Sequence, residues 1–188
     1  MLPIVVGALF LAAFVGLLIA FRALGGSSSP SPASATGATV SGIRCDPSEQ
    51  LAEHYHAHLT LIDHGQAVTV PAGIGLPGTC FYWLHTHTTT GIIHIEAPVS
   101  EASRQFTLGD FFHVWGQPLS AHRVAGMTVG AGDSEQVWVD GAPYTGDLAQ
   151  VPLRSHTQVV IEVGPPFRSP PPSFDWTAPA AVAESGRS

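Results

Sequence analysis

The sequence predicts a mainly β protein of antiparallel sheets, sandwich- or barrel-like, with one short helix. Segments such as residues 54–63 and 157–163 alternate apolar and polar side chains, which is the period of a strand with one buried face. Clusters rich in Gly, Pro and Asp separate these segments and predict tight turns. The chain lacks the regular alternation of strands and helices typical of parallel sheets. It also contains no Gly-rich phosphate loop and no Gly-x-Ser-x-Gly motif.

A long apolar segment begins the chain. Residues 2–21 form an almost unbroken apolar run that Arg22 ends, and about 20 such residues let a helix cross the hydrocarbon core. A cleaved signal peptide usually has a basic start and a small-residue cleavage site, and both are missing here. We therefore favour an N-terminal transmembrane helix, an anchor or signal-anchor over residues 1–24, with a cleaved signal as the alternative.

Composition divides the rest of the chain into three parts. Residues 25–42 are rich in Gly, Ser and Pro and predict a flexible linker. Residues 43–164 contain the strand patterns and predict a His-rich β domain. Residues 165–188 are rich in Pro and predict a disordered tail, although Phe174 and Trp176 offer side chains that would allow it to dock.

Two hairpins open the β domain. Residues 54–70 predict the first, with a turn at His64-Gly65, and residues 80–98 predict the second, with a turn at the threonines 88–90. The helix is predicted over residues 106–116, with Thr107 as N-cap, Asp110 three residues later and Gly116 at its end. Three more β segments follow, at residues 123–129, 137–144 and 157–163, and the second of them is predicted to be a hairpin with a tight turn at Asp140-Gly141.

Histidines fall on one face of each predicted hairpin. In the first hairpin, His54, His56 and His58 alternate with apolar residues and so share a face. In the second hairpin, a turn at the threonines places His85 opposite His94. The side chains expected on that face of the second hairpin are Phe81, Trp83, His85, His87, His94 and Glu96.

Several imidazoles and a carboxylate on one face are a ligand set that suits zinc or copper. The sequence therefore predicts a site for a divalent transition metal, either zinc or copper. Its candidate ligands are His85, His87, His94, His56, His58 and Glu96. The alternative is a hydrogen-bonded network of neutral histidines without a metal.

The chain contains two cysteines, Cys45 and Cys80, which can form a disulfide or bind a metal. We favour a disulfide between Cys45 and Cys80, because the N-terminal segment indicates export to an oxidising compartment. The alternatives are two reduced, buried thiols, or Cys80 as a metal ligand near His85.

Charge and location limit the partners. The formal net charge of −7 excludes nucleic acid as an expected partner. The membrane is the one partner the sequence predicts, reached through the N-terminal helix, and no particular protein partner is indicated. We expect a single-pass membrane protein whose domain is extracytoplasmic, although Arg22 alone would favour the opposite orientation.

Three motifs together resemble a group of bacterial and archaeal exported or membrane-anchored proteins. They are the His-x-His at His56 and His58, the run Leu-His-Thr-His-Thr-Thr-Thr-Gly-Ile-Ile-His-Ile-Glu at residues 84–96, and Phe-Thr-Leu-Gly-Asp-Phe-Phe-His-Val-Trp-Gly at residues 106–116. The resemblance covers most of residues 45–164 and implies one coherent domain. The group has no established activity, so the resemblance implies none here.

Three functions fit the pattern. The first is a membrane-tethered domain that binds the metal for sensing, delivery or structure. The second is a metal-dependent hydrolase in which Glu96 acts as general base and Trp83 and Phe81 wall the pocket. No other catalytic residue is predicted. The third is a structural or interaction module without metal, whose histidines respond to pH.

Overall fold

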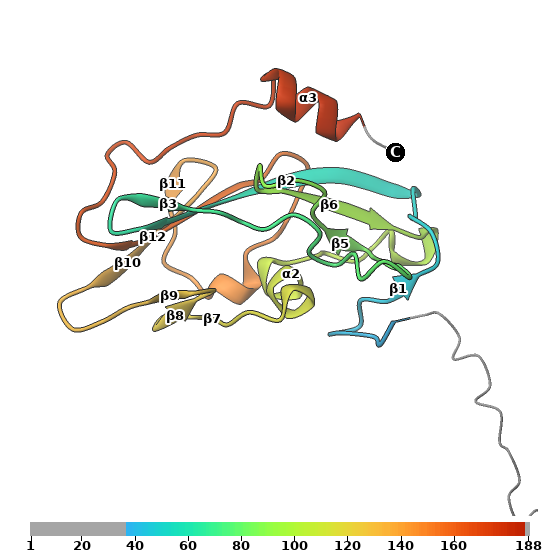
Figure 1. Ribbon diagram of the computed structural model, residues 1–188, viewed down its shortest axis with the longest axis horizontal. Helices are drawn as coiled ribbons and strands as arrows, with labels where there is room; N and C mark the ends of the chain where they lie inside the picture. The colour runs from blue at the N-terminus through green and yellow to red at the C-terminus, as the bar shows by residue number, and fades with distance from the viewer. Residues whose placement is uncertain (1–36, 187–188) are drawn as a thin grey trace, which may run out of the picture. The chain divides into compact units, whose positions relative to one another are not determined.

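The computed structural model describes residues 37–186, and the transmembrane anchor predicted over residues 1–24 lies outside them (Figure 1). Within residues 37–186, no helix is both long enough and apolar enough to cross a bilayer. The last part of the predicted linker, residues 37–42, is already packed on the domain. The Tyr82 hydroxyl, for example, donates to the Ala38 carbonyl oxygen at 2.6 Å.

A seven-stranded sheet forms the centre of the domain. Its strands are β2 (Glu53–Asp63), β3 (Gln66–Val68), β5 (Leu84–His85), β6 (Ile92–Ala97), β10 (Ser134–Val139), β11 (Ala142–Pro143) and β12 (Gln158–Gly164). The order is β11-β10-β12-β2-β6-β5, with β3 also paired to β2. All pairs are antiparallel except β12 with β2, which run parallel. The mainly antiparallel β class is confirmed, and the described strands form an open sheet rather than a closed barrel.

Two of the tight turns lie where the sequence predicts them. His64-Gly65 joins β2 to β3, and Asp140-Gly141 joins β10 to β11. The φ angles are 48° and 76° in the first turn and 51° and 79° in the second. Two-residue hairpin turns of type I′ need positive φ at both positions, and Gly, Asp and His tolerate it better than most residues.

Two smaller sheets flank the central one. Strands β1 (Cys45–Asp46) and β4 (Phe81–Tyr82) pair antiparallel, and the Cys45–Cys80 disulfide links β1 to the residue that precedes β4. The predicted disulfide is confirmed. The other small sheet consists of β7 (Leu119–Ser120), β8 (Arg123–Val124) and β9 (Met127–Thr128), and the 3₁₀ helices are η1 (Val99–Glu101) and η2 (Leu148–Gln150).

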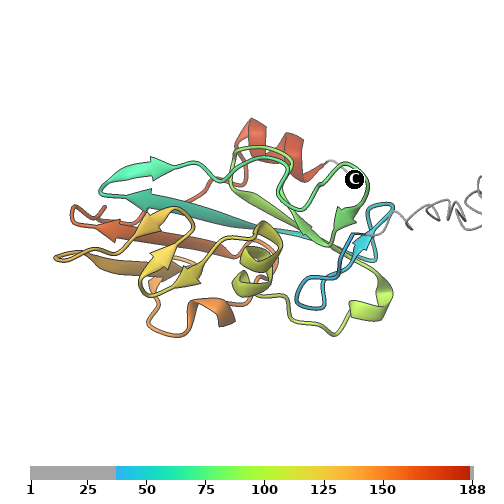
Figure 2. The same cartoon turned by 60° about the horizontal axis from the view of Figure 1, so that its bottom comes forward.

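The predicted helix is α2 (Leu108–Trp115). Thr107 and Asp110 form a capping box, in which each side chain accepts from the other's backbone N–H, and Gly116 ends the helix in the left-handed conformation. Figure 2 shows α2 and the β7–β9 strands on one side of the central sheet, with α3 (Pro179–Ser185) on the other.

The hydrophobic core lies between the central sheet and α2. The side chains of the sheet that face it are those that strand alternation predicts, and they are almost fully buried. These residues are Ala57, Leu59, Leu61, Leu84, Ile93, Ile95, Val159, Ile161 and Val163, together with Leu108, Phe111 and Phe112 of α2. The opposite face of β2, β6 and β5 is therefore the one that carries the histidines.

The C-terminal segment differs from the predicted disordered tail. Residues 165–186 run back over the histidine face and end in α3 (Figure 1). Phe174 stacks on the ring of His58 with 3.8 Å between centroids, and its backbone N–H and carbonyl oxygen both bond to the Gln158 side chain. These contacts join residues far apart in sequence, so a prediction from local composition could not include them. We call residues 165–186 the strap.

Candidate metal centre

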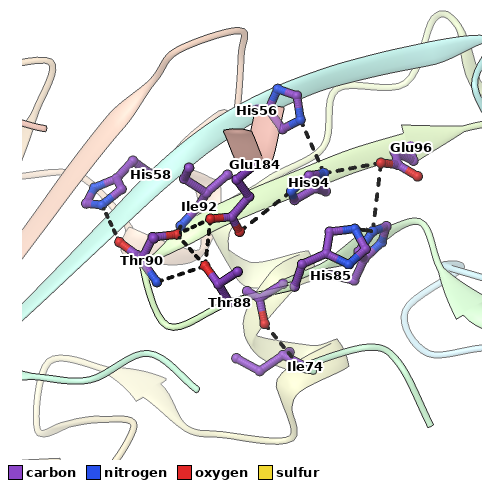
Figure 3. A network of polar contacts seen from close by, with 12 residues as sticks. His56, His58, Ile74, His85, Thr88, Thr90, Ile92, His94, Glu96 and Glu184 are labelled. Atoms are coloured by element: carbon purple, nitrogen blue, oxygen red, sulfur yellow. Dashed lines mark hydrogen bonds and ion pairs between the residues drawn. The ribbon is translucent and has the colours of Figure 1, made fainter. Parts of the chain in front are cut away.

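Strand pairing brings histidines from both hairpins into one row. In the β2–β6 register His56 lies opposite His94, and in the β5–β6 register His85 lies opposite His94. The predicted pairing of His85 with His94 is confirmed. The three rings lie across adjacent strands on the same side of the sheet because each follows the alternation of its own strand (Figure 3).

Four side chains converge closely enough to hold a metal ion. His85, His87, His94 and Glu96 each offer a ligand atom, and these atoms all lie within 4.8 Å of one another. The Nε2 atoms of His85 and His87 are 3.2 Å apart. Glu96 Oε1 lies 3.2 Å from His94 Nδ1 and 3.8 Å from His85 Nε2.

These separations fit tetrahedral coordination. Zinc bonds of about 2.0–2.1 Å at tetrahedral angles separate neighbouring ligand atoms by roughly 3.3 Å. Three of the six separations, 3.2, 3.2 and 3.8 Å, lie near this value and the others are at most 4.8 Å, so side-chain movements would close the group on one ion. The His85, His94 and Glu96 side chains are 0–1% exposed, while His87 is 21% exposed and lies toward the solvent side of the group.

A second group shares His94 with the first. His54, His56 and His94 also bring ligand atoms within 4.8 Å of one another. His56 Nε2 is 3.2 Å from His94 Nδ1, and His54 Nε2 is 3.6 Å from Glu96 Oε1. Since the same Nδ1 atom of His94 faces Glu96 and His56, these two residues border one common site.

His85 is held in an orientation that suits a ligand. Its Nδ1 lies 2.9 Å from the Tyr82 carbonyl oxygen, to which it donates, so its Nε2 carries the lone pair and faces the cluster. Ligating histidines commonly have their other ring nitrogen fixed in this way by a carbonyl or carboxylate. On the solvent side, Glu49 Oε1 lies 3.7 Å from His87 Nε2.

Burial keeps the imidazoles of His85, His56 and His94 neutral. It lowers the pKa of His85 to about 3 and the pKa of both His56 and His94 to about 4, and neighbouring imidazoles add to the effect. Burial also raises the pKa of Glu96. Neutral imidazole is the form that binds a metal, so these histidines remain available as ligands well below pH 6.5.

His58 does not join the cluster, although the sequence makes it a candidate. Its Nε2 donates to the Thr90 carbonyl oxygen at 2.9 Å, and its ring is covered by Phe174. Burial lowers its pKa to about 4. His58 therefore fixes the loop between β5 and β6 and supports the strap.

The expected position of Trp83 on the histidine face is wrong. The extended chain breaks between β4 and β5, and Trp83 lies at this break. Its side chain belongs to the hydrophobic core, and its indole N–H donates to Asp46 Oδ2 at 2.8 Å. A buried indole needs a hydrogen-bond acceptor, and Asp46 provides it on the core side. Trp83 therefore does not wall a pocket beside His85.

Sequence reasoning missed Glu184. This residue of α3 is 2% exposed, and its Oε1 lies 3.8 Å from His94 Nε2 (Figure 3). No pattern near Glu184 indicates this contact, because it depends on the strap returning over the sheet. The aromatic residues Phe174 and Trp176 were the one signal in the sequence that the strap docks.

Several buried polar atoms of the site have no hydrogen-bond partner. They are His54 Nε2, His94 Nε2, Glu96 Oε2 and Glu184 Oε1. Such atoms are rare in folded proteins and are costly unless another group satisfies them. Their concentration around His94, with three more imidazoles close by, fits a site built for a cation. Comparisons with protein-family models, curated proteins and solved structures give no match to this chain.

Proposed function

We propose that the domain binds one divalent transition-metal ion, zinc or copper(II), through His85, His87, His94 and Glu96. The observation that carries the proposal is the convergence of four ligand atoms, mostly buried, within 4.8 Å of one another, with two of the separations at 3.2 Å. Three imidazoles and one carboxylate suit both ions. His56 and His54 border the site and complete its polar wall.

The burial of the site supports a metal-binding function rather than a catalytic one. Catalytic zinc sites keep one coordination position open to water or substrate, whereas closed sites have four protein ligands. Here four ligands are present, and three of them are almost completely buried. With Trp83 in the core, one of the two side chains expected to wall a substrate pocket is lost to the hydrolase alternative. We therefore favour metal storage, delivery or sensing over hydrolysis.

We further propose that the domain works outside the cytoplasm, tethered to a membrane. The Cys45–Cys80 disulfide supports an oxidising compartment. The apolar run over residues 2–21 supports a tether. A metal-binding domain in this position would meet ions that enter the cell envelope.

Metal loading tests the proposal. The full-length chain, purified in detergent, is loaded with zinc or with copper(II), desalted, and analysed for metal by mass spectrometry. We expect one ion per chain in the wild type and a loss of this ion in the variant His85→Ala/His87→Ala/His94→Ala. The matched control replaces three exposed histidines, His64→Ala/His113→Ala/His122→Ala, and should keep the ion.

Equal loading of the two triple variants, or no loading of the wild type by either metal, would show that the cluster is not a metal site. Unchanged circular dichroism of the variants is required alongside, so that loss of metal is not confused with loss of the fold.

A further inference from the structure

The strap ends in a helix that needs its docking contacts. Helix α3 has seven residues and no side-chain cap at its N-terminus, and helices this short are marginal by themselves in water. Two of its residues, Ala181 and Glu184, are buried, and they lie one turn apart on the same side of the helix. The small Ala181 allows α3 to approach the sheet closely, and Glu184 extends into the site.

Both oxygens of the Glu184 carboxylate have a defined position. Oε2 accepts hydrogen bonds of 2.6 Å from the hydroxyls of Thr88 and Thr90 in the loop between β5 and β6. Oε1 is buried without a hydrogen-bond partner and faces His94 Nε2 at 3.8 Å. His94 Nε2 is also buried and without a hydrogen-bond partner. A buried carboxylate is costly, so its placement here calls for a compensating interaction.

The two nitrogens of the His94 ring face opposite partners. Nδ1 faces the ligand cluster through Glu96, and Nε2 faces Glu184 (Figure 3). When a histidine binds a metal, a carboxylate on the other ring nitrogen fixes the tautomer and the ring orientation and makes the ligand more basic. Glu184 lies on this side of His94, with 3.8 Å between Oε1 and Nε2, whereas the Tyr82 carbonyl oxygen already accepts from His85 Nδ1 at 2.9 Å.

We propose that Glu184 is a positioning residue of the metal centre, so that metal binding and docking of the strap stabilise each other. The inference rests on the proposed function of the site. With the ion on Nδ1, the proton of His94 would reside on Nε2, and a small approach of the two side chains from 3.8 Å would let Nε2 donate it to Glu184 Oε1. Docking of α3 then raises the metal affinity. By linkage, the metal favours docking by the same factor. Release of α3 removes the partner of His94 and loosens the ion.

Three full-length proteins test this coupling: the wild type, Glu184→Gln and the control Glu135→Gln. Glutamine keeps the shape of Glu184 but removes its charge. Glu135 also has a buried carboxylate oxygen without a hydrogen-bond partner, but it lies on β10, outside the cluster. Zinc affinity is measured by competition with a chelator. We expect Glu184→Gln to bind roughly 10- to 100-fold more weakly than the wild type, the range typical for such partners, and Glu135→Gln to bind equally.

Two further measurements separate positioning from simple packing. Zinc should slow amide hydrogen exchange in α3 of the wild type and have little effect in Glu184→Gln. In ¹⁵N NMR of the imidazoles, zinc should lock His94 of the wild type with its proton on Nε2, and this signature should be lost or mixed in Glu184→Gln. A purely structural role would change exchange in α3 without zinc, but not the His94 tautomer.

The inference is overturned if the wild type and Glu184→Gln bind zinc equally and zinc leaves exchange in α3 unchanged. In that case the proposed function still stands. A wild type that binds neither zinc nor copper(II) overturns the proposed function, and the inference with it.

Discussion

At the scale of single residues, His85 and His58 show how similar histidines take different roles. Both lie on predicted strands and on the same face of the sheet, and both are buried. His85 donates through Nδ1 to a carbonyl oxygen and turns its Nε2 toward the cluster. His58 uses its Nε2 to hold Thr90, and Phe174 covers its ring.

This difference predicts opposite effects for two variants. His85→Ala should weaken zinc binding by at least about 100-fold, because it removes a ligand rather than a residue that supports one. His58→Ala should leave the affinity within a few-fold but lower the free energy of unfolding by about 1–3 kcal/mol, through the lost hydrogen bond and ring stacking. Chelator competition and urea unfolding measure the two quantities. Equal effects of both variants on affinity would contradict the assignment.

The buried histidines also predict a pH dependence of the metal-free protein. Their pKa values are about 3 for His85 and about 4 for His56, His58 and His94, against 6.5 for an unperturbed histidine. Between these values the unfolded chain binds more protons than the folded chain. The free energy of unfolding that these four neutral histidines contribute is therefore fully present above pH 6.5, and it is lost as the pH falls toward 4. The raised pKa values of Glu96, Glu135 and His64 act in the opposite direction, with smaller shifts than those of the four buried histidines.

Urea unfolding of the metal-free protein at pH 7.0, 5.5 and 4.5 checks this sign. The urea concentration at the midpoint of unfolding should decrease as the pH is lowered from 7.0 to 4.5. A His85→Ala variant should show a shallower dependence than the wild type, since one of the four groups is gone. A midpoint that stays constant or rises between pH 7.0 and 4.5 would show that these histidines are not held neutral by the fold.

At this scale, alternation along the strands was enough to place most of the site. It put His85, His87, His94 and Glu96 on a common face, and the structure brings all four together. It failed at Trp83, because the rule assumes an unbroken strand. The chain bends at Trp83, whose indole N–H donates to Asp46, 37 residues earlier in sequence.

At the scale of the elements, the loop between β5 and β6 positions several groups of the site. It holds His87, supplies the Thr88 and Thr90 hydroxyls to Glu184, and supplies the Thr90 carbonyl oxygen to His58. Gly91 ends it with φ at 86°. A Cβ at Gly91 would overlap the Leu59 carbonyl oxygen, so this position requires glycine for both its conformation and its space.

Gly91→Ala should therefore destabilise the protein by about 2 kcal/mol or more, since it combines an unfavourable φ with a backbone overlap. Zinc affinity should fall as well, because the loop that carries His87 has to move. Gly126→Ala is the matched control, because a Cβ at Gly126 would point into open space and the φ of this residue is not positive. Thermal unfolding of both variants is the measurement, and similar midpoints would refute the role given to Gly91.

The elements were predictable to different degrees. Helix α2 was predictable because its signals are local: the Thr107–Asp110 capping box and Gly116 lie within its own sequence. The parallel pairing of β12 with β2 was not, because its partners lie 100 residues apart and no local pattern selects them. Docking of the strap was missed for the same reason.

At the scale of the whole molecule, the disulfide ties the start of the domain to the strand that leads into the site. Cys45 and Cys80 are 35 residues apart in sequence, and both are buried. Closing a loop of this length restricts the unfolded chain and stabilises the folded state by about 4 kcal/mol in the chain-entropy account. This is a large share of the stability of a single small domain, typically about 5–15 kcal/mol.

The variant Cys45→Ser/Cys80→Ser should accordingly lose about 3–4 kcal/mol of unfolding free energy. The wild type in excess reductant should lose a similar amount, which distinguishes loss of the bond from the effect of the serines. Urea unfolding measures both. Stability that is indifferent to reduction would remove the main structural support for an oxidising compartment.

The binding of one ion among His85, His87, His94 and Glu96 can be observed by crystallography with anomalous scattering. Crystals of the zinc-loaded protein are measured above and below the zinc absorption edge. We expect a single strong anomalous peak about 2.0–2.2 Å from a ring nitrogen of each histidine and from an oxygen of Glu96. Absence of any peak among these four side chains, with zinc bound elsewhere or not at all, would contradict the assignment of the metal centre.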